Sequence, residues 1–317
     1  MPDVLIAEDI RGSAVDALSS RFDVVFQPEL WSDPKALNSQ LADFRALIIR
    51  NQTKVDAELL RSGKKLAVIG RAGVGLDNVD VAAATQAGVI VTSTPDQNAI
   101  SVAELTIGLM ISLARNLPAA DADTKRGNWN RRRFWGTELY GKTFGIIGAG
   151  RIGFLTARRA QAFGMRILAC DPLVSRDNVL LFELNAELVL LGELLGRADV
   201  VSCHLPSTPG TAKLLNAACF AQMKSTAIFL NTSRGQVVDE EALLAALRSG
   251  KIAGAGLDVR ASEPPAMSEL ENLANVLLTP HIGALTYEAQ DRVTTAICED
   301  VARVLDGKTA LNAVVRC

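Results

Sequence analysis

Short, uniformly apolar runs alternate with amphipathic stretches along almost the whole chain, and this rhythm limits the possible folds more than any other feature. In the first third, the runs expected to be strands are 4–7, 24–26, 46–49, 66–69 and 89–91. Amphipathic segments expected to be helices lie between them at 13–20, 57–61 and 79–87. Strands that are apolar on both faces belong to parallel sheets covered by helices on both sides. The pattern therefore predicts an α/β fold.

A second alternating series begins at residue 143. Its expected strands are 143–147, 166–169, 200–203, 228–230, 253–257 and 276–278. Two longer amphipathic segments, 98–117 and 287–305, stand before and after it. We expect the first to be a single helix, capped by Asn98 or Ser101 and stopped at Leu117-Pro118. At 317 residues the chain is about twice as long as a typical single domain. We therefore predict two domains, each with a doubly wound parallel sheet.

The composition excludes several classes of protein. The net charge of −2 provides no overall field that would attract nucleic acid or anionic lipid. The five cysteines form no CxxC pair, so we expect neither a metal site nor a disulfide framework, and Cys317 is expected to be exposed. The longest strongly apolar stretch, 105–114, is shorter than the roughly 20 residues of a membrane helix. The chain starts with an expected strand instead of a signal peptide, which favours a cytoplasmic protein.

A glycine-rich turn follows the expected strand 143–147 directly and opens an expected helix over 152–163. The turn consists of Gly148, Ala149, Gly150, Arg151, Ile152 and Gly153. Its first glycine permits a tight turn, the second lets a pyrophosphate approach the backbone, and the third lets the helix pack on the strand. The helix N-terminus offers free N–H groups to the phosphates. The sequence therefore predicts a dinucleotide site at this turn.

Asp171 ends the next expected strand, 23 positions after Gly148. A carboxylate at this position can accept hydrogen bonds from the ribose hydroxyls of adenosine and would repel a 2′-phosphate. The prediction is therefore NAD instead of NADP. Two alternatives stay open: Asp171 is a simple turn residue before Pro172, or the nearby Arg176 accommodates NADP.

The chain has only two histidines, His204 and His281, and both follow expected strands. The carboxyl ends of parallel strands form the edge at which open α/β sheets bind ligands. Glu263 lies after another strand, and a carboxylate beside an imidazole stabilises its charged form and fixes its tautomer. Arg234 follows a further strand and can bind a substrate carboxylate through two hydrogen bonds. His281 with Glu263 is thus the favoured acid–base pair. For each residue taken singly, a loop or surface role is the alternative.

These motifs resemble the D-isomer-specific 2-hydroxyacid dehydrogenase family, and within it the catalytic part of the D-3-phosphoglycerate dehydrogenases, over nearly the whole chain. The most specific stretches are 70–78, 136–143, the glycine turn, 231–240, 279–284 and 288–290. The resemblance implies that Arg234, Glu263 and His281 are catalytic. It also implies a flavodoxin-like substrate domain made of 1–98 and 283–317, with a Rossmann NAD-binding domain, 99–282, inserted into it.

The resemblance assigns further residues to each ligand. Besides the glycine turn and Asp171, those implied for the cofactor are Leu205, Pro206, Thr232, Ser233, Asp258 and Gly283. Those implied for the substrate are Arg50, Asn51, Val74, Gly75, Asn98 and Arg131. The implied reaction is direct hydride transfer between NAD and a D-2-hydroxy acid or its 2-keto acid. In this reaction His281 exchanges the hydroxyl proton.

The resemblance implies 3-phosphoglycerate as the substrate. Its second anion could be met by Arg50, which matches a phosphate-contacting arginine of these relatives, and by Arg71 and Arg131. The Arg- and Trp-rich segment 129–135, here called the arm, resembles one that embraces a second subunit and lends it an arginine, which implies a homodimer. A solvated basic loop is the alternative.

Three departures from the family pattern could border the substrate pocket. Asn51 replaces a serine, Arg260 replaces an aromatic residue, and Leu285 replaces a small polar residue. Sulfolactate dehydrogenase and hydroxypyruvate or glyoxylate reductase activities therefore stay open. An NAD-sensing, corepressor-like binding protein is the alternative from another class. Because the chain ends soon after its last helix, we expect no serine-binding regulatory domain.

Overall fold

The computed structural model describes residues 2–175 and 178–314, and the chain divides into two compact units. Unit 1 consists of Met1–Asn98 and Leu285–Cys317, and unit 2 of Ala99–Ala284. The first boundary lies where the sequence placed it, and the second lies two residues later. Arg176, the residue that could accommodate NADP, and Cys317, which was expected to be exposed, lie outside the described residues.

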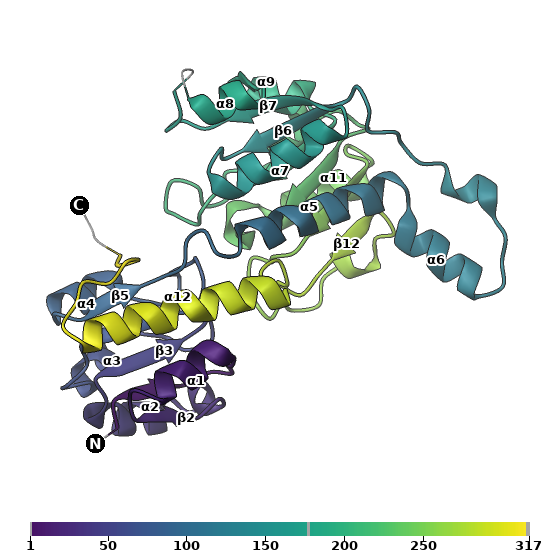
Figure 1. Ribbon diagram of the computed structural model, residues 1–317. Coiled ribbons are helices and arrows are strands. Elements are labelled where there is room, and N and C mark those ends of the chain that lie inside the picture. Colours follow the sequence, from purple (N-terminus) through teal and green to yellow (C-terminus); the bar gives the residue numbers. More distant parts are fainter. Residues whose placement is uncertain (1, 176–177, 315–317) are drawn as a thin grey trace. The chain divides into compact units, whose positions relative to one another are not determined.

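Unit 1 contains a five-stranded parallel sheet (Figure 1). Its strands are β1 (Val4–Ile6), β2 (Val24–Phe26), β3 (Ala46–Ile49), β4 (Val68–Arg71) and β5 (Ile90–Thr92). Their order, β2-β1-β3-β4-β5, is that of flavodoxin-like sheets. The flavodoxin-like prediction for this unit is therefore confirmed.

Helices cover both faces of this sheet. Successive side chains of each strand point to opposite sides, so apolar strands present apolar side chains on both faces, and both must be buried. The helices are α1 (Ser13–Ser19), α2 (Pro34–Gln40), α3 (Ala57–Ser62), α4 (Val81–Gln86) and α12 (Tyr287–Leu305), with short 3₁₀ turns η1 (Leu30–Ser32) and η2 (Leu41–Asp43). Val4 and Ile6 pack with α1 and α12, whereas Leu5 packs with α2, α3 and α4. A Cβ on Gly70 would lie 2.7 Å from Ile297, so this glycine lets α12 approach β4 closely.

Unit 2 contains a seven-stranded parallel sheet of Rossmann type, in the order β12-β11-β10-β9-β6-β7-β8. The strands are β6 (Thr143–Ile147), β7 (Arg166–Cys170), β8 (Glu187–Leu188), β9 (Val200–Cys203), β10 (Ile228–Asn231), β11 (Gly254–Leu257) and β12 (Val276–Leu278). The two predicted doubly wound sheets are thus both present.

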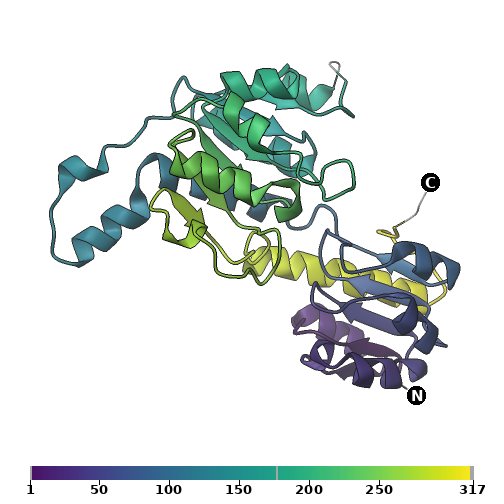
Figure 2. The ribbon, with the colours of Figure 1, turned by 180° about the vertical axis from the view of Figure 1, so that it is seen from behind.

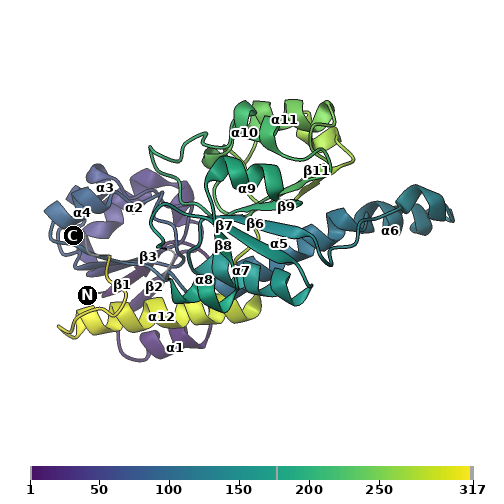
Figure 3. The same ribbon diagram turned by 90° about the horizontal axis from the view of Figure 1, so that it is seen from above.

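The helices of unit 2 form two layers (Figure 3). One layer consists of α9 (Leu191–Arg197), α10 (Ala217–Gln222) and α11 (Glu240–Arg248), and the other of α5 (Ala99–Ala114), α7 (Arg151–Ala162) and α8 (Val179–Glu183). The remaining elements are α6 (Leu117–Lys125) and the 3₁₀ turns η3 (Arg131–Phe134), η4 (Gly235–Val237) and η5 (Leu270–Asn272).

The prediction of a single helix over 98–117 is wrong, because two helices, α5 and α6, divide this segment. The α5 helix ends at Ala114, and Asn116 adopts a left-handed conformation with φ 54° that breaks the helical path. Pro118 lies in the first turn of α6, where its missing N–H has no helical partner to lose, so it starts a helix instead of stopping one. Figure 2 shows α6 and the following segment projecting from the rest of unit 2.

No single helix of the described residues is both long and apolar enough to cross a membrane. The α5 and α6 helices meet the length and composition criteria only as a pair, with a bend of 63° between them.

Candidate active site

The glycine turn lies between β6 and α7, as the sequence predicted. A Cβ on Gly148 would lie 2.8 Å from the carbonyl oxygen of His204, and one on Gly153 would lie 2.2 Å from the carbonyl oxygen of Gly148. Gly150 caps α7 and has open space around its Cβ position. Arg151 and Ile152 form the start of the helix. The turn is therefore tight on its inner side and open where a phosphate group would approach, which fits a dinucleotide.

Asp171 follows β7 and braces this turn. Its Oδ2 accepts a hydrogen bond of 2.9 Å from the backbone N–H of Ala149, and its Oδ1 accepts one of 2.8 Å from Leu173. Each carboxylate oxygen can accept a second hydrogen bond. Leu205 follows β9 and lies next to Gly148, while the following Pro206 is exposed. The structure thus brings Asp171 and Leu205 to the glycine turn.

The turn that carries Arg234 is fixed by hydrogen bonds from buried Asn231 at the end of β10. Asn231 Oδ1 accepts hydrogen bonds of 3.0 Å from the backbone N–H and 2.8 Å from the hydroxyl of Ser233, and its Nδ2 donates to the carbonyl oxygen of Arg234 at 3.0 Å. Thr232 shares a hydrogen bond of 2.8 Å with Thr106 of α5. These roles of Asn231 and Thr106, whose polar side chains lie in otherwise apolar segments, were not predicted from the sequence.

His281 and Glu263 are in direct contact, as expected. The Nδ1 atom of His281 lies 2.6 Å from Oε2 of Glu263, and His281 has a left-handed φ of 55°. Burial raises the pKa of Glu263, but the hydrogen bond and charge of His281, with a smaller effect of Arg234, lower it overall. Glu263 therefore holds an ionised carboxylate on Nδ1, which leaves Nε2 of the ring for another partner.

Asp258 holds the loop that carries His281. This carboxylate is 1% exposed, and its Oδ1 accepts from the Thr279 hydroxyl at 2.6 Å and from Ile282 N–H at 2.8 Å. Its Oδ2 accepts from the Gly283 N–H at 2.8 Å. The backbone N–H of His281 donates to the Asp258 carbonyl oxygen at 2.8 Å. Sequence reasoning placed Asp258 and Gly283 beside the cofactor and missed this anchoring role.

His204 lies in a different environment from His281. Its Nε2 lies 2.9 Å from the hydroxyl of Ser202, and its Nδ1 is buried without a hydrogen-bond partner among the described residues. Burial lowers the pKa of His204 from 6.5 to about 4. The imidazole is therefore neutral near pH 7, and His204 is a poor proton carrier.

In unit 1, Arg50 follows β3 in a loop anchored on Glu8, whose side chain is buried. Glu8 accepts hydrogen bonds from the backbone N–H groups of Arg50 at 2.8 Å, Gln52 at 3.2 Å and Thr53 at 2.9 Å. The Arg50 guanidinium donates to Gln290 of α12. Burial lowers the pKa of Arg50, and the charges of Glu8 and Asp9 oppose this. Glu8 lies two positions after the end of β1, and this place after a strand was the only sequence signal for its role.

The other residues implied for the substrate occupy varied positions. Asn51 is exposed, and Val74 and Gly75 are half-buried in the loop after β4. The buried Arg71 folds over Gly73, which has a φ of 146° and whose Cβ position is filled by this guanidinium. Asn98 is buried, with its Oδ1 unpaired among the described residues. Arg131 is exposed in η3, on the arm of unit 2.

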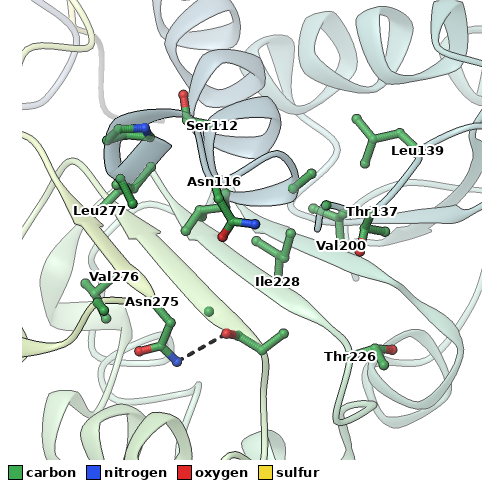
Figure 4. A pocket seen from close by; sticks show the side chains of 18 of the residues that line it. Ser112, Asn116, Thr137, Leu139, Val200, Thr226, Ile228, Asn275, Val276 and Leu277 are labelled. Carbon is green, nitrogen blue, oxygen red and sulfur yellow. Dashed lines mark hydrogen bonds between the residues drawn. The ribbon is translucent and has the colours of Figure 1, made fainter. Parts of the chain in front are cut away.

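A cavity of about 500 Å³ lies at the opposite edge of the unit 2 sheet, at the amino ends of its strands (Figure 4). Val200, Ile228 and Val276 line it together with Ser112 of α5. Asn275 donates a hydrogen bond of 3.1 Å to the Ala253 carbonyl oxygen at its border. The cavity is lined by none of the predicted site residues, so it is separate from the glycine turn. Within residues 2–175 and 178–314, His, Cys, Asp and Glu form no group of three suited to a metal ion.

Comparison with known proteins identifies the family. The family profile "D-isomer specific 2-hydroxyacid dehydrogenase, NAD binding domain" matches residues 107–283. The chain is 44% identical over 315 residues to D-3-phosphoglycerate dehydrogenase of Methanocaldococcus jannaschii, covering 99% of this chain and 59% of that relative. It thus spans about three fifths of the length of this curated relative.

Solved structures match at full length. A Thermus thermophilus protein is 37% identical with a TM-score of 0.92, and the match covers 99% of this chain and 100% of that one. A glyoxylate reductase described from Paecilomyes thermophila is 33% identical with a TM-score of 0.89, and the match covers 99% of both chains. The chain belongs to the D-isomer specific 2-hydroxyacid dehydrogenase family.

Proposed function

We propose that this protein is an NAD-dependent dehydrogenase that transfers a hydride between a D-2-hydroxy acid and its 2-keto acid. The contact of 2.6 Å between His281 and the ionised Glu263 is the observation that carries this proposal. Both residues lie in the unit that matches the family's NAD binding domain, in which the glycine turn fits a dinucleotide. Arg234, Glu263 and His281 are the proposed catalytic residues.

The proposed mechanism uses the free nitrogen of the His281 ring. Because Nδ1 is bonded to Glu263, Nε2 takes the hydroxyl proton during oxidation and returns it to the carbonyl oxygen during reduction. Glu263 stabilises the imidazolium, and Arg234 holds the substrate carboxylate through two hydrogen bonds. When bound, the cofactor supplies the hydride acceptor for oxidation and the hydride donor for reduction. Such proton transfer contributes about 10² to 10⁴ in rate.

We propose 3-phosphoglycerate as the substrate. The 44% identity to a D-3-phosphoglycerate dehydrogenase supports this choice. Arg50 and Arg71 at the ends of neighbouring strands offer positive charge to a second anion, with Asn51, Val74, Gly75 and Asn98 as further proposed substrate contacts. Arg260 is not a free cation, because its guanidinium is bound to Glu240 and Glu271.

The test is oxidation of NADH with phosphohydroxypyruvate, hydroxypyruvate, glyoxylate and sulfopyruvate. We expect the highest kcat/KM with phosphohydroxypyruvate. A preference for glyoxylate or hydroxypyruvate would favour the alternative reductase activity, which the similarity to a glyoxylate reductase supports. A preference for sulfopyruvate would identify a sulfolactate dehydrogenase. Turnover with none of the four would favour the NAD-sensing, corepressor-like binding protein.

We propose NAD instead of NADP, because the Asp171 carboxylate beside the glycine turn would repel a 2′-phosphate. Leu205, Pro206, Thr232, Ser233, Asp258 and Gly283 are the other proposed residues along the cofactor. We expect a higher kcat/KM with NADH than with NADPH. In Asp171→Ser the ratio of the two kcat/KM values should fall by about tenfold. An unaltered preference in that variant would contradict the role of Asp171.

We further propose a cytoplasmic homodimer that binds neither nucleic acid nor membrane. Trp129 and Trp135 of the arm are 78% and 83% exposed, and a second copy of the chain would cover them and place Arg131 near its substrate. The free cysteines Cys170, Cys203, Cys219 and Cys298 are typical of a reducing compartment. Light scattering should give the mass of a dimer, and Trp135→Ser should shift the mass toward a monomer.

A further inference from the structure

Arg260 has an almost fully buried side chain in the segment that follows β11. Its guanidinium is 8% exposed and is shared between two carboxylates. The Nε and Nη2 atoms donate to Glu240 at 3.1 and 3.2 Å, and Nη1 donates to Glu271 at 2.7 Å. Glu240 begins α11 and Glu271 lies in η5. One guanidinium therefore ties the segment after β11 to two other elements.

The backbone at Arg260 contacts Glu263 of the proposed proton-transfer pair. The Arg260 N–H donates to Oε1 of Glu263 at 3.2 Å, while Oε2 of the same carboxylate binds His281. The next N–H, of Ala261, donates to Glu240 at 2.6 Å. Glu240 thus binds both the Arg260 side chain and the N–H of Ala261, and so fixes the peptide group that follows the one whose N–H donates to Glu263.

The same backbone packs against the turn that carries Arg234. A Cβ on Gly235 would lie 1.9 Å from the carbonyl carbon of Arg260 and 2.4 Å from the nitrogen of Ala261. Gln236 also donates to the Ala261 carbonyl oxygen at 3.1 Å. The segment at Arg260 therefore packs against the Arg234 turn on one side and is hydrogen-bonded to Glu263 on the other. A shift of this segment would disturb both contacts.

In this network one positive guanidinium is shared by two negative carboxylates. Hydrogen bonds from Arg260 and Ser268 lower the pKa of Glu271 to about 2. Burial lowers the pKa of Arg260, but its bonds to Glu240 and Glu271 raise it overall. Removing one partner of such a network leaves an unpaired buried charge and destabilises the fold. Replacing the whole network by apolar residues is, in contrast, often neutral for stability. Stability alone is therefore a weak explanation for three charged groups here.

We propose that Arg260 is a positioning residue for proton transfer. Its ion pairs to Glu240 and Glu271 fix the segment 260–263, so that Glu263 stays against His281 and the Arg234 turn keeps its place. This inference rests on the proposed function, which assigns these three residues to the reaction.

The first test compares Arg260→Met, Arg260→Lys and Arg248→Met in the full chain. We expect kcat to fall at least tenfold in Arg260→Met with the KM for NADH unchanged, and Arg260→Lys to restore part of the loss. Arg248→Met is the matched control, because it removes an exposed ion pair between α11 and Glu269 without touching the segment 260–263. Equal kcat in all three variants and the unmodified protein would overturn the proposal.

The second test does not depend on turnover. The chain has two histidines, so His204→Gln identifies the ring signals of His281 in a proton–nitrogen NMR spectrum. We expect the hydrogen-bonded Nδ1 proton of His281 to be visible in the unmodified protein and lost in Arg260→Met, at unchanged circular dichroism. A retained signal would overturn the proposal. If Arg260→Met fails to fold, Arg260→Lys and Glu271→Gln replace it in both tests.

The two readouts separate the possible failures. If the unmodified protein reduces none of the keto acids, the proposed function fails. The NMR comparison then still decides whether Arg260 positions Glu263 against His281.

Discussion

His204 and His281 lie at the carboxyl edge of the same sheet, but their surroundings give the two imidazoles different properties. His204 follows β9, where burial lowers its pKa to about 4 and keeps the ring neutral. The His281 side chain is 41% exposed, and its Nδ1 contacts the ionised Glu263. Burial disfavours the imidazolium form, whereas a neighbouring carboxylate favours it. The comparison shows that a position at a strand end does not by itself make a proton carrier.

Replacing each histidine by alanine tests this comparison most strongly. In His281→Ala we expect kcat for keto-acid reduction to fall by about 10² to 10⁴, because the proton donor is lost. NADH affinity should be unchanged in a fluorescence titration, since the glycine turn lies between β6 and α7. His204→Ala is the control and should retain at least a tenth of the kcat. Similar losses in both variants would contradict the separate roles of the two rings.

The buried ring of His204 should make stability depend on pH. Its pKa in the folded state, about 4, is below the ordinary value of 6.5. Between these values the unfolded chain binds a proton that the folded chain does not, so the stabilisation is complete above pH 6.5 and declines as the pH falls toward 4. The decline reaches about 3 kcal/mol for a shift of this size.

Urea denaturation at several pH values, on the unmodified protein and on His204→Gln, measures this contribution. The free energy of unfolding of the unmodified protein should fall more steeply between pH 6.5 and 4 than that of the variant. Parallel curves for the two proteins would show that the His204 ring is accessible to protons in the folded state.

Among these changes, Glu263→Gln should have the smallest effect, and it tests whether the carboxylate beside His281 makes this ring differ from His204. The amide keeps the size of the side chain but removes the negative charge that stabilises the His281 cation. Because charge-assisted hydrogen bonds are roughly twice as strong as neutral ones, we expect kcat to fall by about tenfold. Steady-state kinetics with phosphohydroxypyruvate measure this change, and Glu269→Gln on the exposed pair with Arg248 is the control. An unchanged kcat would mean that the carboxylate charge has no part in the reaction.

Much of the fold could be predicted because its signals are local. The apolar runs 143–147 and 200–203 correspond to β6 and β9 at the same bounds, since a strand covered on both faces must be apolar on both faces. The break in 98–117 was missed because it depends on the left-handed backbone of Asn116, which a helical pattern does not reveal. A proline next to such a break can begin a helix as well as end one.

Within the site, contacts between strand ends were predictable and the supporting contacts were not. Glu263 and His281 were expected to meet because each follows a strand of one sheet. The anchoring roles of Asp258 and Glu8 were missed, because a buried carboxylate that accepts several backbone N–H groups resembles any acidic residue in the sequence. The sequence marked Arg260 only as a departure from the family pattern, and the binding of its guanidinium by Glu240 and Glu271 was not predicted.

The sequence by itself determined the class of fold, the glycine turn and the short list of proton carriers, because these depend on periodicity, on glycine spacing and on having only two histidines. Only the tertiary structure decided which histidine is neutral and buried, and which arginine is occupied by internal ion pairs. The physical reason is that burial and charge pairing depend on distances between residues far apart in the chain. His281 and Glu263 are 18 positions apart, yet their side-chain atoms lie 2.6 Å from each other.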